Sequence, residues 1–258
     1  MNMNIYRQIL KKLLSPLASI GRYFMLMYRV FARPERVRIY FRQYVDEIYK
    51  LGVNSVGIVL LISFFIGAVI CVQIKLNIES PWMPKFVVGY TTREIMLLEF
   101  SSSIMSLILA GKVGSNIASE IGTMRVTQQI DALDIMGVNS ASFLILPKIV
   151  ALVSFIPLLV VFSIAAGITG ALATCWAGLM PAADLGYGLQ YSFEEWFLWC
   201  GLIKSLFFAF IIASVSSYFG YTVKGGSIAV GKASTDSVVT SSVLILFSDL
   251  LLTQMLMG

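Results

Sequence analysis

The sequence predicts an all-α, polytopic integral membrane protein, and three observations lead to that class. Of its 258 residues, 58% are hydrophobic and 13% are charged, and the mean hydropathy is +0.84. Runs of about 20 apolar residues recur, and a helix of that length crosses the hydrocarbon core of a bilayer, which is about 30 Å thick. The net charge is +5, but most of the cations lie in the first fifty residues, a distribution that does not indicate nucleic-acid binding.

The first fifty residues (1–50) form a basic amphipathic arm in this interpretation. Cations alternate with apolar residues at helical spacing, and such a helix lies in the plane of the bilayer interface. Pro34 is expected to end or kink it. The alternative is an ordinary solvated arm. The apolar residues of the predicted face are Ile5, Leu10, Leu13, Leu17, Phe24, Met27 and Phe31, and the cations opposite them include Arg7, Lys11, Arg22, Arg29 and Arg33.

The remainder, 51–258, is predicted to be one membrane domain with five spans. The third apolar run would extend about 54 Å as a single helix, so it must tilt, kink or protrude. Pro147 and Pro157 are available to kink it. Small residues recur every four positions in this run, a pattern that lets helices approach closely. The spans are predicted at about 53–76, 94–116, 143–178, 196–221 and 237–256.

The distribution of Lys and Arg predicts the orientation, because cytosolic loops carry an excess of both. The arm holds many, whereas the loop 179–195 and the carboxyl tail hold none. Lys85 and Arg93 in the first external loop are a modest contrary signal. The arm dominates, so the amino terminus is expected in the cytosol, and five spans place the carboxyl terminus outside.

A polar segment, ASEIGTMRVTQQIDALDIMG at 118–137, separates the second and third spans. It has an apolar and a polar side, so it is predicted to be an amphipathic cytosolic helix. The residues alone leave two roles open. The helix rests on the membrane surface, or its acidic, amide-rich face binds a protein partner.

The run LILAGKVGSNIASEIGTMRVTQQIDALDIMGVNSASFLILPKIVA (107–151) resembles the signature of the MlaE family, the permease subunits of Mla/MCE-type ABC phospholipid transporters. The closing stretch 225–253 also resembles the end of that family. One departure stands at Glu99-Phe100-Ser101-Ser102, where family members have Glu-Leu-x-Pro, and the missing proline leaves the local helix geometry open. The matching parts are AGKVG (110–114), ASEIGTMRVTQQIDAL (118–133), MGV (136–138) and the Pro147–Lys148 pair.

The resemblance implies a homodimer that moves glycerophospholipids between a bacterial inner (cytoplasmic) membrane and an external MCE-domain carrier protein. It implies that 118–137 is a coupling helix that docks on a separate cytosolic ABC ATPase, with room for a small cytosolic accessory subunit. ATP and magnesium would bind that ATPase, so this chain is expected to hold no cofactor or metal and to catalyse no reaction. The ATPase-coupling residues that it implies are Glu120, Gly122, Thr123, Arg125, Gln128, Gln129, Asp131 and Asp134.

Three ionisable residues fall inside the predicted spans: Glu99, Lys204 and Asp249. Such residues are costly in hydrocarbon and face a cavity or one another. The predicted topology places all three about 8–12 Å from the outer ends of their spans. One interpretation is a substrate path in which Lys204 contacts a lipid headgroup while the two carboxylates hold that cation in place. The other is a structural salt-bridge cluster.

Two further functions stay open. A proton-coupled secondary transporter would use the same three charges as a relay, and internal inverted repeats, which are not apparent, would favour it. A membrane scaffold that anchors an ATPase has no need of buried charges. GSIAVGK (226–232) nearly matches a phosphate-binding loop, but Ala233 replaces the required Ser or Thr, and a tight cytosolic turn is the better interpretation.

Overall fold

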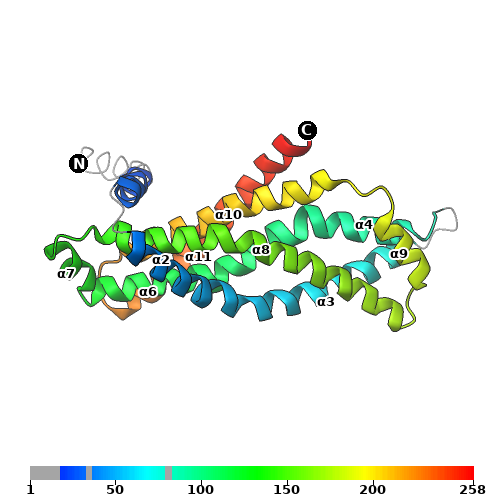
Figure 1. Cartoon of the computed structure of the whole chain (residues 1–258), viewed down its shortest axis with the longest axis horizontal. Coiled ribbons are helices and arrows are strands. Elements are labelled where there is room, and N and C mark those ends of the chain that lie inside the picture. The colour runs from blue at the N-terminus through cyan, green and yellow to red at the C-terminus, as the bar shows by residue number, and fades with distance from the viewer. Residues whose placement is uncertain (1–17, 33–36, 79–82) are drawn as a thin grey trace, which may run out of the picture.

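The part of the chain that the computed structural model describes, residues 18–32, 37–78 and 83–258, is built from helices without a strand. The helices form an elongated bundle (Figure 1), which confirms the predicted all-α, polytopic class. Five helical runs among these residues are long and apolar enough to cross a membrane: Tyr40–Asn77, Val87–Val126, Ser140–Trp176, Glu195–Tyr221 and Ser227–Met257.

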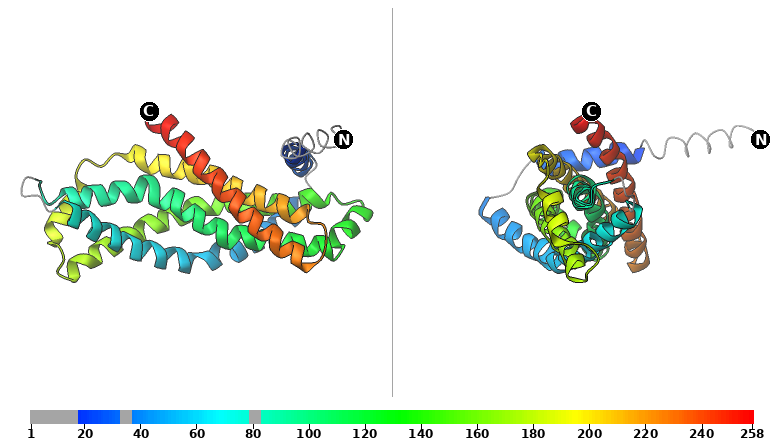
Figure 2. Two further views of the ribbon diagram at one scale, coloured as in Figure 1. Left: turned by 180° about the vertical axis from the view of Figure 1, so that it is seen from behind. Right: turned by 90° about the vertical axis from the view of Figure 1, so that its right-hand side faces the viewer.

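A helix at 18–32 lies across the bundle axis, as Figure 1 and the right-hand view of Figure 2 show. Phe24 and Phe31 are exposed, which agrees with the predicted interfacial face, but Met27 is buried in the protein core instead of facing lipid. Tyr23 donates a hydrogen bond of 2.8 Å to Ser214 on α10 (Glu195–Tyr221). The other residues predicted to shape the arm lie outside the described residues: Ile5, Arg7, Leu10, Lys11, Leu13, Leu17, Arg33 and Pro34.

The first membrane run contains α2 (Val37–Glu47), η1 (Ile48–Val53) and α3 (Asn54–Asn77). The helix is continuous across residue 50, where the arm is predicted to give way to the membrane domain. The short element η1 is π-helical, a form with i→i+5 hydrogen bonds that is frequent at functional sites.

The second run contains α4 (Val87–Ile95), η2 (Met96–Ile104), α5 (Met105–Leu109), η3 (Ala110–Gly114) and α6 (Ser115–Val126). Both η2 and η3 are π-helical. The stretch that departs from the family pattern, Glu99 to Ser102, lies inside η2. Without a proline the helix is unbroken there, but its turns are wider than those of an α-helix.

The predicted single helix at 118–137 is wrong. Its first half is the end of α6, and a second helix, α7 (Gln129–Ile135), follows after a break. Gln128 has a φ of 61°, a left-handed conformation that no helix interior accommodates. Arg125 at the end of α6 and Asp131 on α7 form an ion pair of 2.6 Å, which holds α7 against α6. Apolar periodicity runs through both helices, so it did not reveal the break.

The third run is one helix, α8 (Ser140–Trp176), that continues through Pro147 and Pro157. At about 55 Å it is longer than the hydrocarbon core, so it protrudes or tilts, as predicted. It packs closely on α3, because a Cβ atom added to Gly170 would lie 1.9 Å from the carbonyl oxygen of Phe64. The four-residue spacing of small side chains therefore serves helix packing within the chain.

The remaining helices are α9 (Ala182–Gln190), α10, and α11 (Ser227–Met257). The last span begins ten residues earlier than predicted. GSIAVGK is therefore not a turn as a whole, because only its first residue, Gly226, belongs to the loop 222–226 and the others are helical. The added turns pack on α6, where Ser234 donates a hydrogen bond of 3.1 Å to the carbonyl oxygen of Ser115. Further on, α11 crosses the bundle obliquely (Figure 2).

Candidate functional site

An ionic cluster joins three membrane runs. Lys204 on α10 has its Nζ atom 3.1 Å from Oε1 of Glu99 on η2 and 3.0 Å from Oδ1 of Asp249 on α11. The ammonium also donates a hydrogen bond of 3.3 Å to the carbonyl oxygen of Leu98. The three charges that the sequence predicts at similar depth are thus in contact.

The members of this cluster differ in accessibility. The side chain of Lys204 is 0% exposed, that of Asp249 is 15% exposed and that of Glu99 is 45% exposed. This differs from the expected arrangement, in which Lys204 meets a headgroup, because the two carboxylates and the surrounding helices enclose the ammonium. Glu99 is the open member. The cluster has two carboxyl groups for one ammonium, and the more exposed carboxyl group is that of Glu99.

Buried serines hold η2, the element that carries Glu99, against its neighbours. Ser163 on α8 donates a hydrogen bond of 3.2 Å to Ser101 and shares another of 2.8 Å with Ser63 on α3. Hydroxyl pairs of this kind link helices in an apolar environment. These serines were not predicted to link helices, although the polar run Ser101–Ser103 inside an apolar span indicates such contacts.

At the opposite end of the bundle from α9, α6 and α7 form a corner (Figure 1). Several of the predicted ATPase-coupling residues are engaged within the chain there. Gly122 is buried, and a Cβ atom at this position would lie 3.1 Å from Val230. Arg125 pairs with Asp131, and Asp134 accepts a hydrogen bond of 2.7 Å from Ser140.

Other predicted coupling residues are open. Gln128 and Gln129 are exposed, and so is Thr123, although its hydroxyl donates to the carbonyl oxygen of Ser119. Two apolar residues at the other end of α7, which are not among the predicted coupling residues, are also exposed: Ile135 is 87% exposed and Met136 is 68% exposed. The signal for them was an apolar pair at a helix end, immediately before Gly137. We call Gln128, Gln129, Ile135 and Met136 the α7 tip.

Glu120, the remaining predicted coupling residue, belongs to a second ionic cluster. Its Oε2 atom lies 2.8 Å from Nζ of Lys148 on α8, and its Oε1 atom lies 2.5 Å from Nζ of Lys50 on η1. Lys148 also pairs with Glu47 of α2 at 2.6 Å. The sequence analysis quoted Lys148 within the family pattern but did not predict these contacts.

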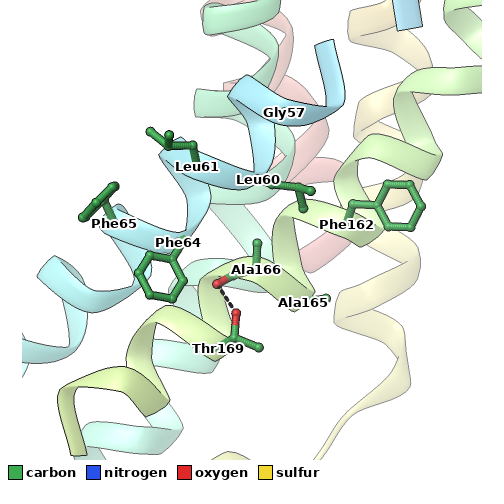
Figure 3. A pocket seen from close by; sticks show the side chains of 9 residues that line it. All are labelled: Gly57, Leu60, Leu61, Phe64, Phe65, Phe162, Ala165, Ala166 and Thr169. Atoms are coloured by element: carbon green, nitrogen blue, oxygen red, sulfur yellow. Dashed lines mark hydrogen bonds between the residues drawn. The ribbon is translucent and has the colours of Figure 1, made fainter. Parts of the chain in front are cut away.

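An apolar groove with a volume of about 570 Å³ runs between α3 and α8. Figure 3 shows Thr169 in its wall, and the hydroxyl of this residue donates to the carbonyl oxygen of Ala166 in the same helix at 2.8 Å. The groove carries no charged side chain, so it fits apolar groups such as lipid chains. Its lining residues are Gly57, Leu60, Leu61, Phe64, Phe65, Phe162, Ala165, Ala166 and Thr169.

Comparison with known proteins agrees with this architecture. The sequence profile of the permease MlaE family matches residues 44–255. A "Probable ABC transporter permease protein" of Rickettsia bellii is 33% identical over 99% of this chain and 98% of its own length. A protein of the same description from Pyropia yezoensis is 33% identical over 88% of this chain and 86% of its own length, and one from Synechocystis is 30% identical over 89% and 87%. The profile match and these relatives, together with the five membrane runs, show that the chain belongs to the MlaE permease family.

Proposed function

We propose that this chain is the permease subunit of an ABC transporter that moves glycerophospholipids between a bacterial inner membrane and an external MCE-type carrier protein. It works as a homodimer, with its amino terminus in the cytosol and its carboxyl terminus outside. A separate ATPase binds ATP and magnesium. The complex can also include a small cytosolic accessory subunit. The permease carries out no covalent chemistry. Its family membership and its ABC-permease relatives support the permease role and favour it over a proton-coupled transporter or a passive scaffold.

The observation that supports a lipid substrate is the exposed carboxylate of Glu99 within an apolar span. A phospholipid needs apolar walls for its chains and a polar site for its headgroup. The cluster offers such a polar site, and its negative charge suits the cationic amine of a zwitterionic headgroup. Because Lys204 is enclosed, we assign the headgroup contact to Glu99 and a holding role to the ammonium.

The same carboxylate supports a homodimer. A half-exposed charge facing hydrocarbon is costly, so the face around Glu99 requires a covering surface. In an isologous dimer the same patch of both copies meets about a twofold axis. Two such faces would enclose one shared polar cavity instead of leaving two charges in lipid.

The α7 tip supports ATPase docking. Ile135 and Met136 are large, apolar and exposed at the end of the bundle that carries the basic arm. Exposed apolar side chains rimmed by polar ones are typical of protein interfaces. We therefore place the ATPase contact at the α7 tip and not at Glu120, which is paired within the chain.

The experiment is purification of the tagged protein with its associated subunits in mild detergent, followed by reconstitution into vesicles with a fluorescent phospholipid. We expect an ATPase to copurify, phospholipid to be found in the complex by mass spectrometry, and phospholipid to be transferred to the carrier only when ATP is present. Transfer that ignores ATP but follows a proton gradient would establish the secondary transporter instead. Absence of both lipid and ATP dependence would reject the proposal.

A further inference from the structure

The second ionic cluster joins elements of three different membrane runs. The side chain of Lys148 is only 3% exposed, and its ammonium donates to Glu47 at 2.6 Å and to Glu120 at 2.8 Å. Glu47 ends α2, Glu120 lies on α6 and Lys148 lies on α8. One buried cation therefore ties the first, second and third runs together.

The charges of this cluster balance. Lys50, whose side chain is 48% exposed, pairs with the second oxygen of Glu120, so two ammonium groups face two carboxylates. The four ion-paired groups carry no net charge as a set, which favours a role inside the chain; Asp46, which is exposed, also lines the cavity beside them. The two lysines are not equivalent, because removing one partner of a buried pair leaves an uncompensated charge, whereas an exposed pair contributes little.

The cluster lies between the ATPase-docking corner and the arm. Glu120 is on α6, which leads within a few residues to the α7 tip. Glu47 stands immediately before the π-helical η1, at the joint between α2 and the first span. Lys148 is thus in contact with both α6 and that joint. Without its ammonium, the ion pair that still joins α6 to the first run is the one between Glu120 and Lys50, whose side chain is 48% exposed.

There is room for the cluster to rearrange. A cavity of about 230 Å³ borders Gln43, Glu47, Glu120 and Lys148. Oε1 of Gln43 and Oε2 of Glu47 are buried and have no hydrogen-bond partner among the described residues. These two acceptors border the same cavity as the Lys148 side chain. Coupling requires an element with two discrete arrangements, and a second arrangement of the cluster would use these acceptors.

We propose that Lys148 is a positioning residue, and that its ion pairs with Glu47 and Glu120 make α2 and the first span follow α6 when the docked ATPase moves it. This inference rests on the proposed function, because it concerns how ATP hydrolysis is linked to transport. It assigns to Glu120 an internal role that differs from direct contact with the ATPase.

The test compares Lys148→Met with Lys148→Arg in the complete complex, reconstituted with its copurified ATPase and a fluorescent phospholipid. The measurement is phospholipid transferred per ATP hydrolysed. We expect Lys148→Met to lower this ratio about tenfold while ATP hydrolysis continues, since residues that carry coupling change it on that scale. Lys148→Arg should restore most of the ratio. Lys50→Met is the matched control, because it removes the exposed lysine from the same carboxylate, and it should stay within about twofold of the natural protein.

A transfer-to-hydrolysis ratio that is unchanged in Lys148→Met overturns the inference, and so does an equal fall in Lys50→Met. If Lys148→Met does not assemble, Glu47→Gln gives the decisive ratio, since it weakens the link to α2 and leaves Lys148 paired with Glu120. An unchanged ratio in Glu47→Gln then overturns the inference. Failure of the natural complex to transfer phospholipid with ATP would instead reject the proposed function, so the two failures are distinguishable.

Discussion

Replacing Lys204 by Met should destabilise the protein more than any other single change in its cluster. The Lys204 side chain is 0% exposed and lies 3.0 Å from Asp249, whose own side chain is 15% exposed. Breaking a buried pair by removing one partner costs about 3–5 kcal/mol, because the other charge stays buried without compensation. In Asp249→Asn the ammonium keeps Glu99, so the cost should be smaller. In Glu99→Gln it should be smallest, about 1 kcal/mol or less, because this carboxylate is 45% exposed.

The measurement is the midpoint of thermal unfolding in detergent. A loss of 3–5 kcal/mol corresponds to a midpoint lower by roughly 10 °C for a chain of this size. The control is Lys204→Arg, which keeps the charge and should recover part of the loss. If Glu99→Gln lowers the midpoint as much as Lys204→Met, the ranking by burial is refuted.

Transport should show the opposite order. Glu99 is the open member of the cluster, so Glu99→Gln should reduce ATP-driven phospholipid transfer per folded complex several-fold while the midpoint hardly changes. Lys204→Arg should retain transfer, because the carboxylates stay paired. Full transfer per folded complex in Glu99→Gln would leave the cluster as a packing element without contact to the headgroup.

Three other predictions follow from the fold. The double change Ile135→Asp with Met136→Asp should abolish copurification of the ATPase without lowering the unfolding midpoint, because apolar interface anchors are each worth about 2 kcal/mol of binding free energy. The control, in which both residues are Leu, should still copurify with the ATPase. If the Asp variant also copurifies with the ATPase, the docking site is not at the α7 tip. Gly170→Ala should lower the free energy of unfolding by about 1–3 kcal/mol, because the added Cβ atom meets the α3 backbone. Gly57→Ala is the control and should leave the unfolding midpoint unchanged, because an added Cβ atom there has nothing within 4 Å. Equal midpoints of the two variants would contradict the close packing. Gln128→Cys, in a variant whose three natural cysteines are replaced by serine, should react with a membrane-impermeant thiol reagent only from the cytosolic side. Labelling from outside would show that the predicted topology is inverted.

The five membrane runs could be predicted from sequence because the bilayer leaves few alternatives. Every backbone polar group in hydrocarbon must be satisfied within the segment, so a long apolar run has to be helical. The contact among Glu99, Lys204 and Asp249 was predictable for a similar reason. Three costly charges at one depth find each other.

The features that escaped prediction depend on tertiary packing. The break at Gln128 falls within a continuous apolar periodicity, and Arg125 contacts Asp131 across the turn. The coupling role of Glu120 was implied by the family resemblance, but its partner Lys148 comes from another span. Sequence spacing along one helix carries no record of a partner on another helix. For the same reason, depth alone does not tell which of three clustered charges stays open.

The two ionic clusters are built on one helical run and differ in one respect. Glu99 and Glu120 both lie on Val87–Val126, about 30 Å apart along the helix, and each is held by a buried lysine from a different run. The cluster around Lys148 pairs two ammonium groups with two carboxylates, and its most exposed member is Lys50, whose side chain is 48% exposed. The cluster around Lys204 keeps an unbalanced carboxylate that is open to its surroundings. A cluster whose carboxylates are each paired fixes the position of a helix, whereas a cluster with a surplus, exposed carboxylate can also bind a cationic group. Under the proposed function, the second run would carry a point of attachment at one end and a point of contact for substrate within the membrane. The π-helical segments η2 and η3 are the places along it where its helical geometry departs from the α form.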